Sequence, residues 1–244
     1  MRKSRYSLNF GGYPLKGIIR KGFTLAEVLI TLGIIGVVAA MTIPNLITNY
    51  QKKQTVVKLQ KGISTMAQTV KLVEEEYGAM ENWDVSLSHL DFIDMYFRPF
   101  TKIMLTCDPI TKCGYTPVNN NVWMQANGVY DYYGNPNHGG RVPFMVMDGF
   151  VYTFSHYAPN SSFINEKNHR VIIIDINGSK KPNRIGRDVF FLYRDVEANS
   201  IIPYGADMSK EEIKKDCSKT GRGLTCAAMI RDYGWDIPKN YPWK

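Results

Sequence analysis

Residues 20–46 read RKGFTLAEVLITLGIIGVVAAMTIPNL. Between Phe23 and Ile43 this stretch carries one charged side chain, Glu27. At about 1.5 Å rise per residue, a helix over this run spans roughly 30 Å, which is close to the hydrocarbon thickness of a bilayer. A carboxylate inside hydrocarbon costs about 2.5–3.5 kcal/mol on insertion scales. The need for a membrane anchor therefore does not explain why Glu27 is there.

The positive charge of the chain, +8 in total, is concentrated ahead of this run. Residues 1–22 contain six cations and no acid, whereas the rest of the chain has 24 basic and 22 acidic residues. The six are Arg2, Lys3, Arg5, Lys16, Arg20 and Lys21. A nearly neutral remainder argues against specific nucleic-acid binding. The basic flank predicts a cytoplasmic N-terminus and an extracytoplasmic remainder, and the apolar run is too long for a secretory signal peptide.

A helical pattern continues past the apolar run. Apolar residues recur at spacings of three and four from Val56 to Tyr77, which predicts an amphipathic helix ending near Gly78. The stripe consists of Val56, Leu59, Ile63, Met66, Val70, Val73 and Tyr77. We expect Pro44 to kink this long helix or to melt it locally.

Beyond residue 78 the pattern predicts a compact α+β head with an antiparallel sheet. We expect helices over 84–98, capped by Asp84, and over 210–217. The predicted strands are 121–126, 129–133, 143–147, 150–155, 170–176 and 188–193. The Asp-Gly step in 147–150, MDGF, predicts a hairpin between two of them.

The four cysteines fall into two local pairs, Cys107 with Cys113 and Cys217 with Cys226. Neither pair has the spacing of a zinc site. An even count on the far side of a membrane segment favours two disulfides, which require an oxidising compartment. The alternative is four unpaired thiols.

The motif K-G-F-T-L-x-E at 21–27, followed by the apolar run and Pro44, resembles the N-terminus of type IV pilins and type II secretion pseudopilins. The resemblance implies that a prepilin peptidase cleaves after Gly22 and that Phe23 is then N-methylated. It also places Pro44 at the helix-kink position of the family. It implies four parts: a removed leader at 1–22, a transmembrane and assembly helix at 23–46, its amphipathic continuation at 47–78, and an extracytoplasmic head at 79–244.

The same resemblance implies a structural subunit with no enzymatic activity. Its partners would be copies of itself, other pilin-like subunits, the peptidase and methyltransferase, and an inner-membrane assembly platform. We expect a single-pass inner-membrane protein that assembles into a type IV pilus or a secretion pseudopilus, in the periplasm or at the cell surface. The alternative is a minor, membrane-anchored binding module that caps or decorates such a filament.

The resemblance also suggests a role for Glu27. In a staggered filament, its carboxylate can meet the ammonium that cleavage creates at Phe23 of a neighbouring copy, and the pair is tolerated where each charge alone is costly. The other interpretation is an interfacial glutamate that reaches toward lipid headgroups.

In the head, 174–190 reads IDINGSKKPNRIGRDVF. Asp175, Asn177 and Asp188 offer oxygen ligands of the kind that calcium prefers, although the spacing is not that of an EF-hand. Similar loops are features of some pilin-like heads. The other interpretation is a structural turn around Asn177-Gly178. We expect no other cofactor.

The aromatic residues Trp123, Tyr130, Tyr132 and Tyr133 suit either the core or an exposed binding platform. Four histidines, at 89, 138, 156 and 169, stand far apart, and no catalytic motif accompanies them.

Overall fold

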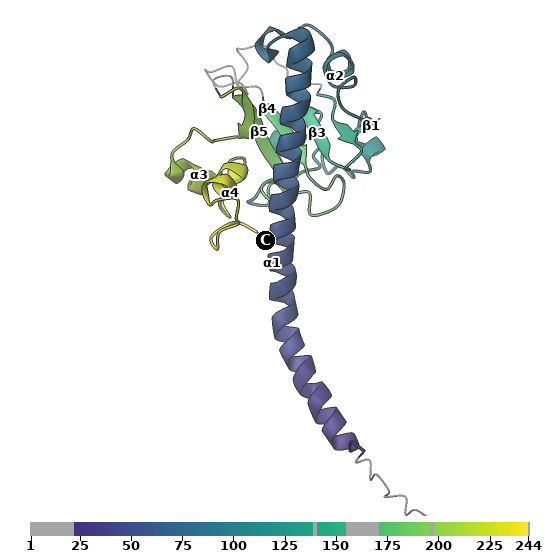
Figure 1. Ribbon diagram of the computed structural model, residues 1–244, viewed down its shortest axis with the longest axis vertical. Helices are drawn as coiled ribbons and strands as arrows, with labels where there is room; N and C mark the ends of the chain where they lie inside the picture. The colour runs from purple at the N-terminus through teal and green to yellow at the C-terminus, as the bar shows by residue number, and fades with distance from the viewer. Residues whose placement is uncertain (1–21, 139–140, 155–170, 196–197, 244) are drawn as a thin grey trace, which may run out of the picture. The chain divides into compact units, whose positions relative to one another are not determined.

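The computed structural model describes residues 22–138, 141–154, 171–195 and 198–243. The chain divides into two compact units, Met1–Ile47 and Thr48–Lys244. The first described helix, α1, runs from Leu25 to Tyr77 and is continuous through Pro44. The local melting considered for Pro44 is therefore absent, because a proline removes one intrahelical hydrogen bond and the neighbouring bonds remain. Figure 1 shows α1 and the labelled elements of the head.

The second part of α1, Thr48–Tyr77, carries the apolar stripe that the sequence predicts, and most of this stripe is buried. Val56, Leu59, Met66, Val70 and Val73 are all buried. Ile63 packs against the same core while partly exposed, and Tyr77 at the end of the helix stays exposed. Gly78, with φ +79°, ends the helix in the left-handed conformation expected of a C-terminal glycine.

The head contains one six-stranded sheet in which each strand pairs with the next along the chain, in the order β1-β2-β3-β4-β5-β6. All five pairings are antiparallel. The strands are β1 (Ile103–Thr106), β2 (Phe144–Val146), β3 (Val151–Phe154), β4 (Val171–Asp175), β5 (Val189–Asp195) and β6 (Ser200–Pro203). The predicted hairpin joins β2 to β3, with Gly149 at φ +78°. An α+β architecture with an antiparallel sheet is confirmed.

Both faces of this sheet are covered, which explains why β4 reads as a continuous apolar run. On one face Ile172 and Ile174 join the buried residues of α1 in the larger core. On the other face Val171 and Ile173 pack with Trp123 in a second core. Figure 1 shows the second part of α1 crossing in front of β3, β4 and β5.

Two predicted strands are wrong. The segment 121–126 forms only isolated bridges and a turn, and 129–133 leads into a short 3-10 helix, Tyr132–Gly134. The N–H groups of Val122 and Trp123 donate to Gly134 O, and Gln125 N–H donates to Val129 O, so turns satisfy this backbone. The four strands predicted over 143–147, 150–155, 170–176 and 188–193 correspond to β2 to β5, although residues 155 and 170 lie outside the described part.

The helices of the head also differ from the prediction in places. The first is α2 (His89–Tyr96), and its cap is Ser88, whose side chain accepts from Asp91 N–H. The prediction of Asp84 as cap is wrong, because its carboxylate instead accepts from Ser86. Helix α3 (Lys210–Asp216) agrees with the predicted 210–217, whereas α4 (Cys226–Asp232) was not predicted.

Candidate processing and assembly segment

Gly22 and Phe23, the residues of the predicted cleavage site, precede α1 and are exposed. The Phe23 side chain is 87% exposed. A Cβ built on Gly22 would meet no atom within 4 Å. Packing among the described residues therefore gives no reason for glycine at position 22.

Thr24 and Glu27 form a capping box at the start of α1. The N–H and the hydroxyl of Thr24 each donate to Glu27 Oε2 at 2.8 Å. The Glu27 N–H donates to Thr24 Oγ1 at 3.2 Å. Two orphan N–H groups of the first turn are satisfied in this reciprocal way. The residues T-x-x-E are a known sequence signal for this arrangement, so the box was open to prediction and was missed.

The capping box uses one oxygen of the Glu27 carboxylate. Both described hydrogen bonds go to Oε2, and no described group donates to Oε1. Thr24 lies after the predicted cleavage site, so its contacts do not depend on the leader. The carboxylate is therefore held in place with one oxygen left to accept from another molecule.

The first part of α1 exposes apolar side chains on every side. Each of the large apolar residues between Leu25 and Ile47 is at least 40% exposed. The hydroxyls of Thr31 and Thr42 donate to carbonyls of the preceding turn, so these polar groups are satisfied inside the helix. Within the described part of the chain, one helix, α1, is long enough and apolar enough to span a membrane, as judged by its length and composition.

A comparison with protein families matches residues 19–43 to the prokaryotic N-terminal methylation motif. This segment is the type IV pilin and pseudopilin signature. The motif indicates a type IV pilin-like protein that is processed as a prepilin. Curated proteins and solved structures give no match to the chain.

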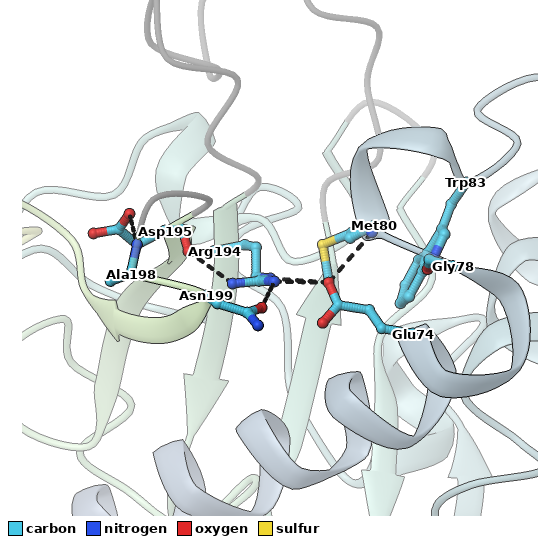
Figure 2. Close-up of polar contacts among 8 residues, drawn as sticks. All are labelled: Glu74, Gly78, Met80, Trp83, Arg194, Asp195, Ala198 and Asn199. Carbon is cyan, nitrogen blue, oxygen red and sulfur yellow. Dashed lines mark hydrogen bonds and ion pairs between the residues drawn. The ribbon is translucent and has the colours of Figure 1, made fainter.

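The pilin-like helix is fastened to the sheet of the head by a buried ion pair. The Arg194 guanidinium on β5 donates from Nε and Nη2 to Glu74 Oε1 on α1, at 3.2 and 2.8 Å. Their side chains are 5% and 15% exposed. Figure 2 shows Glu74 between Arg194 and the N–H of Met80, which donates to the same oxygen. Asn199 Oδ1 also accepts from Arg194, so the charge is held by several partners.

Two further contacts join α1 to the hairpin that holds β2 and β3. The Tyr152 hydroxyl donates to Gly62 O at 3.1 Å. Lys61 Nζ lies 3.0 Å from Asp148 Oδ2 in an exposed ion pair. A Cβ on Gly62 would overlap Cδ1 of the buried Ile174, so a larger residue here would require the end of that side chain to move.

Both predicted disulfides are present in the structure. Cys107 is bonded to Cys113, and Cys217 is bonded to Cys226. The first pair closes the loop after β1 and packs in the second core. The second joins the end of α3 to the start of α4. No described cysteine is free.

The three residues considered for calcium lie together in one hydrogen-bond network. Asn177 N–H donates to Asp175 Oδ1 at 3.1 Å, and its side-chain amide donates to Asp188 Oδ2 at 3.2 Å. The Tyr115 hydroxyl and Trp123 Nε1 donate to Asp175 Oδ2 at 2.8 and 2.9 Å. Burial, followed by the charge of Asp188, raises the pKa of Asp175 well above its ordinary value.

Asp188 is enclosed in the same way by its own loop. The N–H groups of Arg184 and Asn183 donate to its two oxygens at 2.6 and 2.9 Å. Burial raises the pKa of Asp188. Of the three predicted side chains, only Asn177 Oδ1 is buried without a hydrogen-bond partner among the described residues.

This network is what the turn interpretation expects, with Gly178 at φ +63°. Hydrogen bonds from N–H and O–H groups already satisfy both carboxylates, so the described contacts hold this loop without an ion. Calcium binding stays a prediction for this loop. Among the described residues, no three His, Cys, Asp or Glu side chains gather as a metal-binding group.

The aromatic residues divide between the two interpretations. Trp123 is fully buried, whereas Tyr130 is 41% exposed. Tyr133 packs edge-on against Phe191, and the Arg222 guanidinium lies 5.0 Å from its ring. Of the four histidines, His156 and His169 lie outside the described residues.

Proposed function

We propose that the chain is a structural subunit of a type IV pilus or a type II secretion pseudopilus. It is cleaved after Gly22, methylated at Phe23, and polymerised through the apolar part of α1. The observation that carries this proposal is that the methylation motif at 19–43 covers the start of a helix whose large apolar side chains are exposed up to Ile47. Such a surface requires lipid or other helices around it.

The capping box suggests how Glu27 would contact a neighbouring copy during assembly. Thr24 holds Oε2 of Glu27 and leaves Oε1 to accept from the methylated ammonium of Phe23 in a neighbouring copy. In an apolar filament core the two charges are tolerated as a pair, and each is costly alone. Glu27 would then set the register between neighbouring helices as well as their attraction.

Replacing Glu27 by Gln tests this step. Glu27→Gln keeps the size of the side chain and an oxygen that can cap the helix, but it removes the charge that the ammonium requires. We expect membrane insertion and cleavage at the wild-type level, with at least about a tenfold loss of sheared filament, since a charge-assisted bond contributes about 1.5–3 kcal/mol.

The matched control is Thr31→Val, which removes a hydroxyl already satisfied inside the same helix. Filament yield should stay at the wild-type level in this control. Wild-type filament yield from Glu27→Gln would remove the ion pair from the mechanism, and recovery of chains that all retain Met1 would remove the processing step as well.

A second candidate, a minor subunit that binds a ligand at the filament tip or side, is favoured by one observation. A cavity of about 690 Å³ in the head is lined by Tyr133, Tyr204 and Arg222, among others. Its lining combines the two tyrosines with charged and hydroxyl side chains such as Lys215, Asp216 and Thr220, so a polar ligand is the kind that it suits. The proportion of this chain in sheared filaments separates the two roles: a major subunit dominates the filament, and a minor subunit is present in trace amounts.

A further inference from the structure

A second groove in the head, of about 360 Å³, has a wall of cations. Lys58 of α1 and Lys181 and Arg187 of the 176–188 loop line it. The lining also contains Tyr50, Gln51, Gln54, Thr55, Trp243 and one acid, Asp188. All of these residues belong to the head unit, Thr48–Lys244.

The cations of this groove have no carboxylate bound to them. Lys58, Lys181 and Arg187 form no salt bridge with any described residue. Apart from Asp188, neither wall carries an acid. Residues 48–73 contain five lysines, residues 176–187 contain four cations, and neither range contains Asp or Glu. Unpaired like charges that share a groove repel one another, and a bound anion relieves that repulsion.

Asp188, the one acid in the lining, does not neutralise the cations of the groove. Its two oxygens already accept from the N–H groups of Asn183 and Arg184 and from the Asn177 amide. The groups that bind its oxygens therefore all belong to its own loop. Arg187 also lies near it, although the guanidinium is positioned 5.1 Å from the Trp243 ring.

The chemistry of the lining suits a phosphate ester. A guanidinium binds phosphate oxygens bidentately, and ammonium groups add point charges. Gln51, Gln54 and Thr55 supply further donors from one helix. Arg187 and Lys52 both lie beside the Trp243 ring, and Lys52 Nζ is 6.0 Å from its centroid. Lys52 therefore adds a fourth cation beside the groove.

We propose that this groove binds a phosphate-bearing anion. Two sources share that chemistry: the headgroup of an anionic phospholipid and a soluble phosphate ester. Tyr50 and Trp243, aromatic residues among cations, are typical of sites at a lipid–water boundary. The proposal is independent of cleavage and of filament assembly.

Hydrogen exchange on the full chain tests this proposal. In detergent micelles, inorganic phosphate and glycerol phosphate are titrated against chloride at matched ionic strength. In a second arm, the chain is reconstituted in phosphatidylcholine vesicles with or without phosphatidylglycerol. We expect ligand binding to slow amide exchange in 50–58 and 176–188. A soluble phosphate ester as ligand would slow it in the first arm, and a phospholipid headgroup would slow it in the second.

Two variants and a control make the result specific. Lys181→Ala/Arg187→Ala should weaken the response about tenfold or more, because each charge-assisted hydrogen bond contributes roughly that factor. Lys58→Gln, a milder change on the helix wall, should weaken it in the same direction. Lys210→Ala/Lys214→Ala removes two exposed lysines of α3, outside the groove, and should leave it unchanged.

The proposal is overturned when neither soluble phosphate nor phosphatidylglycerol slows exchange in the wild-type chain. It is also overturned when the α3 control weakens the response as much as the groove variants do, since the effect is then one of net charge. Loss of filaments in the groove variants without any phosphate response would assign the cations to contact with a second copy instead.

Discussion

Arg194 is a cation buried at the junction of α1 and the sheet, and its environment decides what its loss does. Its guanidinium is shared by Glu74, Asn199 and the carbonyl of Asp195. Removing one partner of a buried pair leaves the other charge without compensation, whereas removing both avoids that penalty.

The expected result for Arg194→Met is a loss of about 3–5 kcal/mol in the free energy of unfolding. The double variant Arg194→Met/Glu74→Met should lose clearly less. Denaturant titration of the full chain in detergent, followed by near-ultraviolet circular dichroism, measures both.

Arg98→Met provides the control, because its ion pair with Asp94 is exposed, at 45% and 44%. An exposed pair contributes about 0–1 kcal/mol, so this variant should be close to wild type. Equal losses from Arg98→Met and Arg194→Met would contradict the buried-pair account.

At the scale of residues, sequence reasoning found local signals and missed distant ones. Glu27 stands out as the one charge of an apolar run, and Thr24 three residues before it completes a motif that can be read directly. Glu74 and Arg194 are separated by 120 positions and resemble any other surface charges. Only the folded sheet brings them together, and a single sequence carries no record of that.

At the scale of elements, α1 packs closely on the sheet at Gly62, a residue without a side chain. Gly62 faces Ile174 and accepts from the Tyr152 hydroxyl. A larger residue must push the helix away from β4 or force Ile174 out of its rotamer.

We expect Gly62→Val to lower the free energy of unfolding by about 1–3 kcal/mol through overpacking. Gln60→Val, on the exposed side of the same turn, isolates the effect of valine on the helix itself and should change stability by less than about 1 kcal/mol. Thermal unfolding of the two variants provides the comparison, and equal melting temperatures would show that Gly62 is not a packing requirement.

The 176–188 loop makes the stability of the head depend on pH. Burial raises the pKa values of Asp175 and Asp188 in the folded state above the ordinary value of 3.8. A carboxyl group of this kind binds its proton more tightly when folded. Its contribution is complete below pH of about 4 and is lost as the pH rises through the folded pKa.

Asp188→Asn should therefore flatten the fall in stability between about pH 4 and pH 7. The variant removes one titrating group and the charge that helps to raise the pKa of Asp175. Urea midpoints at three pH values, for wild type and variant, measure this slope. An unchanged slope would mean that the pair does not control the pH response.

Long periodic elements and strands beside a clear turn signal were predicted, whereas β1, β6 and α4 were not. The stripe from Val56 to Val73 and the apolar run of β4 are long enough to identify a helix and a strand. The edge strands β1 and β6 have four residues each, and β6 ends in a proline. The residues 121–126 have the composition of a strand, but Asn119, Asn120 and Gly128 adopt positive φ and turn the chain on both sides.

At the scale of the whole molecule, the two units are built for different surroundings. The head has two cores of its own, one on each face of the sheet. The large apolar side chains of the first part of α1 are exposed instead. In the sequence, the apolar run ends and charged residues become frequent close to this boundary, near residue 47.

A fragment of residues 48–244 should therefore be soluble and folded without detergent. Gel filtration should give a monomer, and near-ultraviolet circular dichroism should show the fixed aromatic environment of Trp83, which stacks on Tyr96 at 4.5 Å. The full chain is the control and should aggregate when detergent is removed. A fragment that also aggregates would show that the head needs the first unit to fold.

The two disulfides have a mechanical consequence. They close short loops, with sequence separations of 6 and 9, and neither includes a residue of α1. Among the described residues, a pull along the axis of α1 is thus resisted in shear by noncovalent contacts: the Glu74–Arg194 pair, the Tyr152–Gly62 bond and the apolar stripe. Resistance to such a pull then depends on side-chain packing and hydrogen bonds, and a reducing agent would break none of these contacts directly.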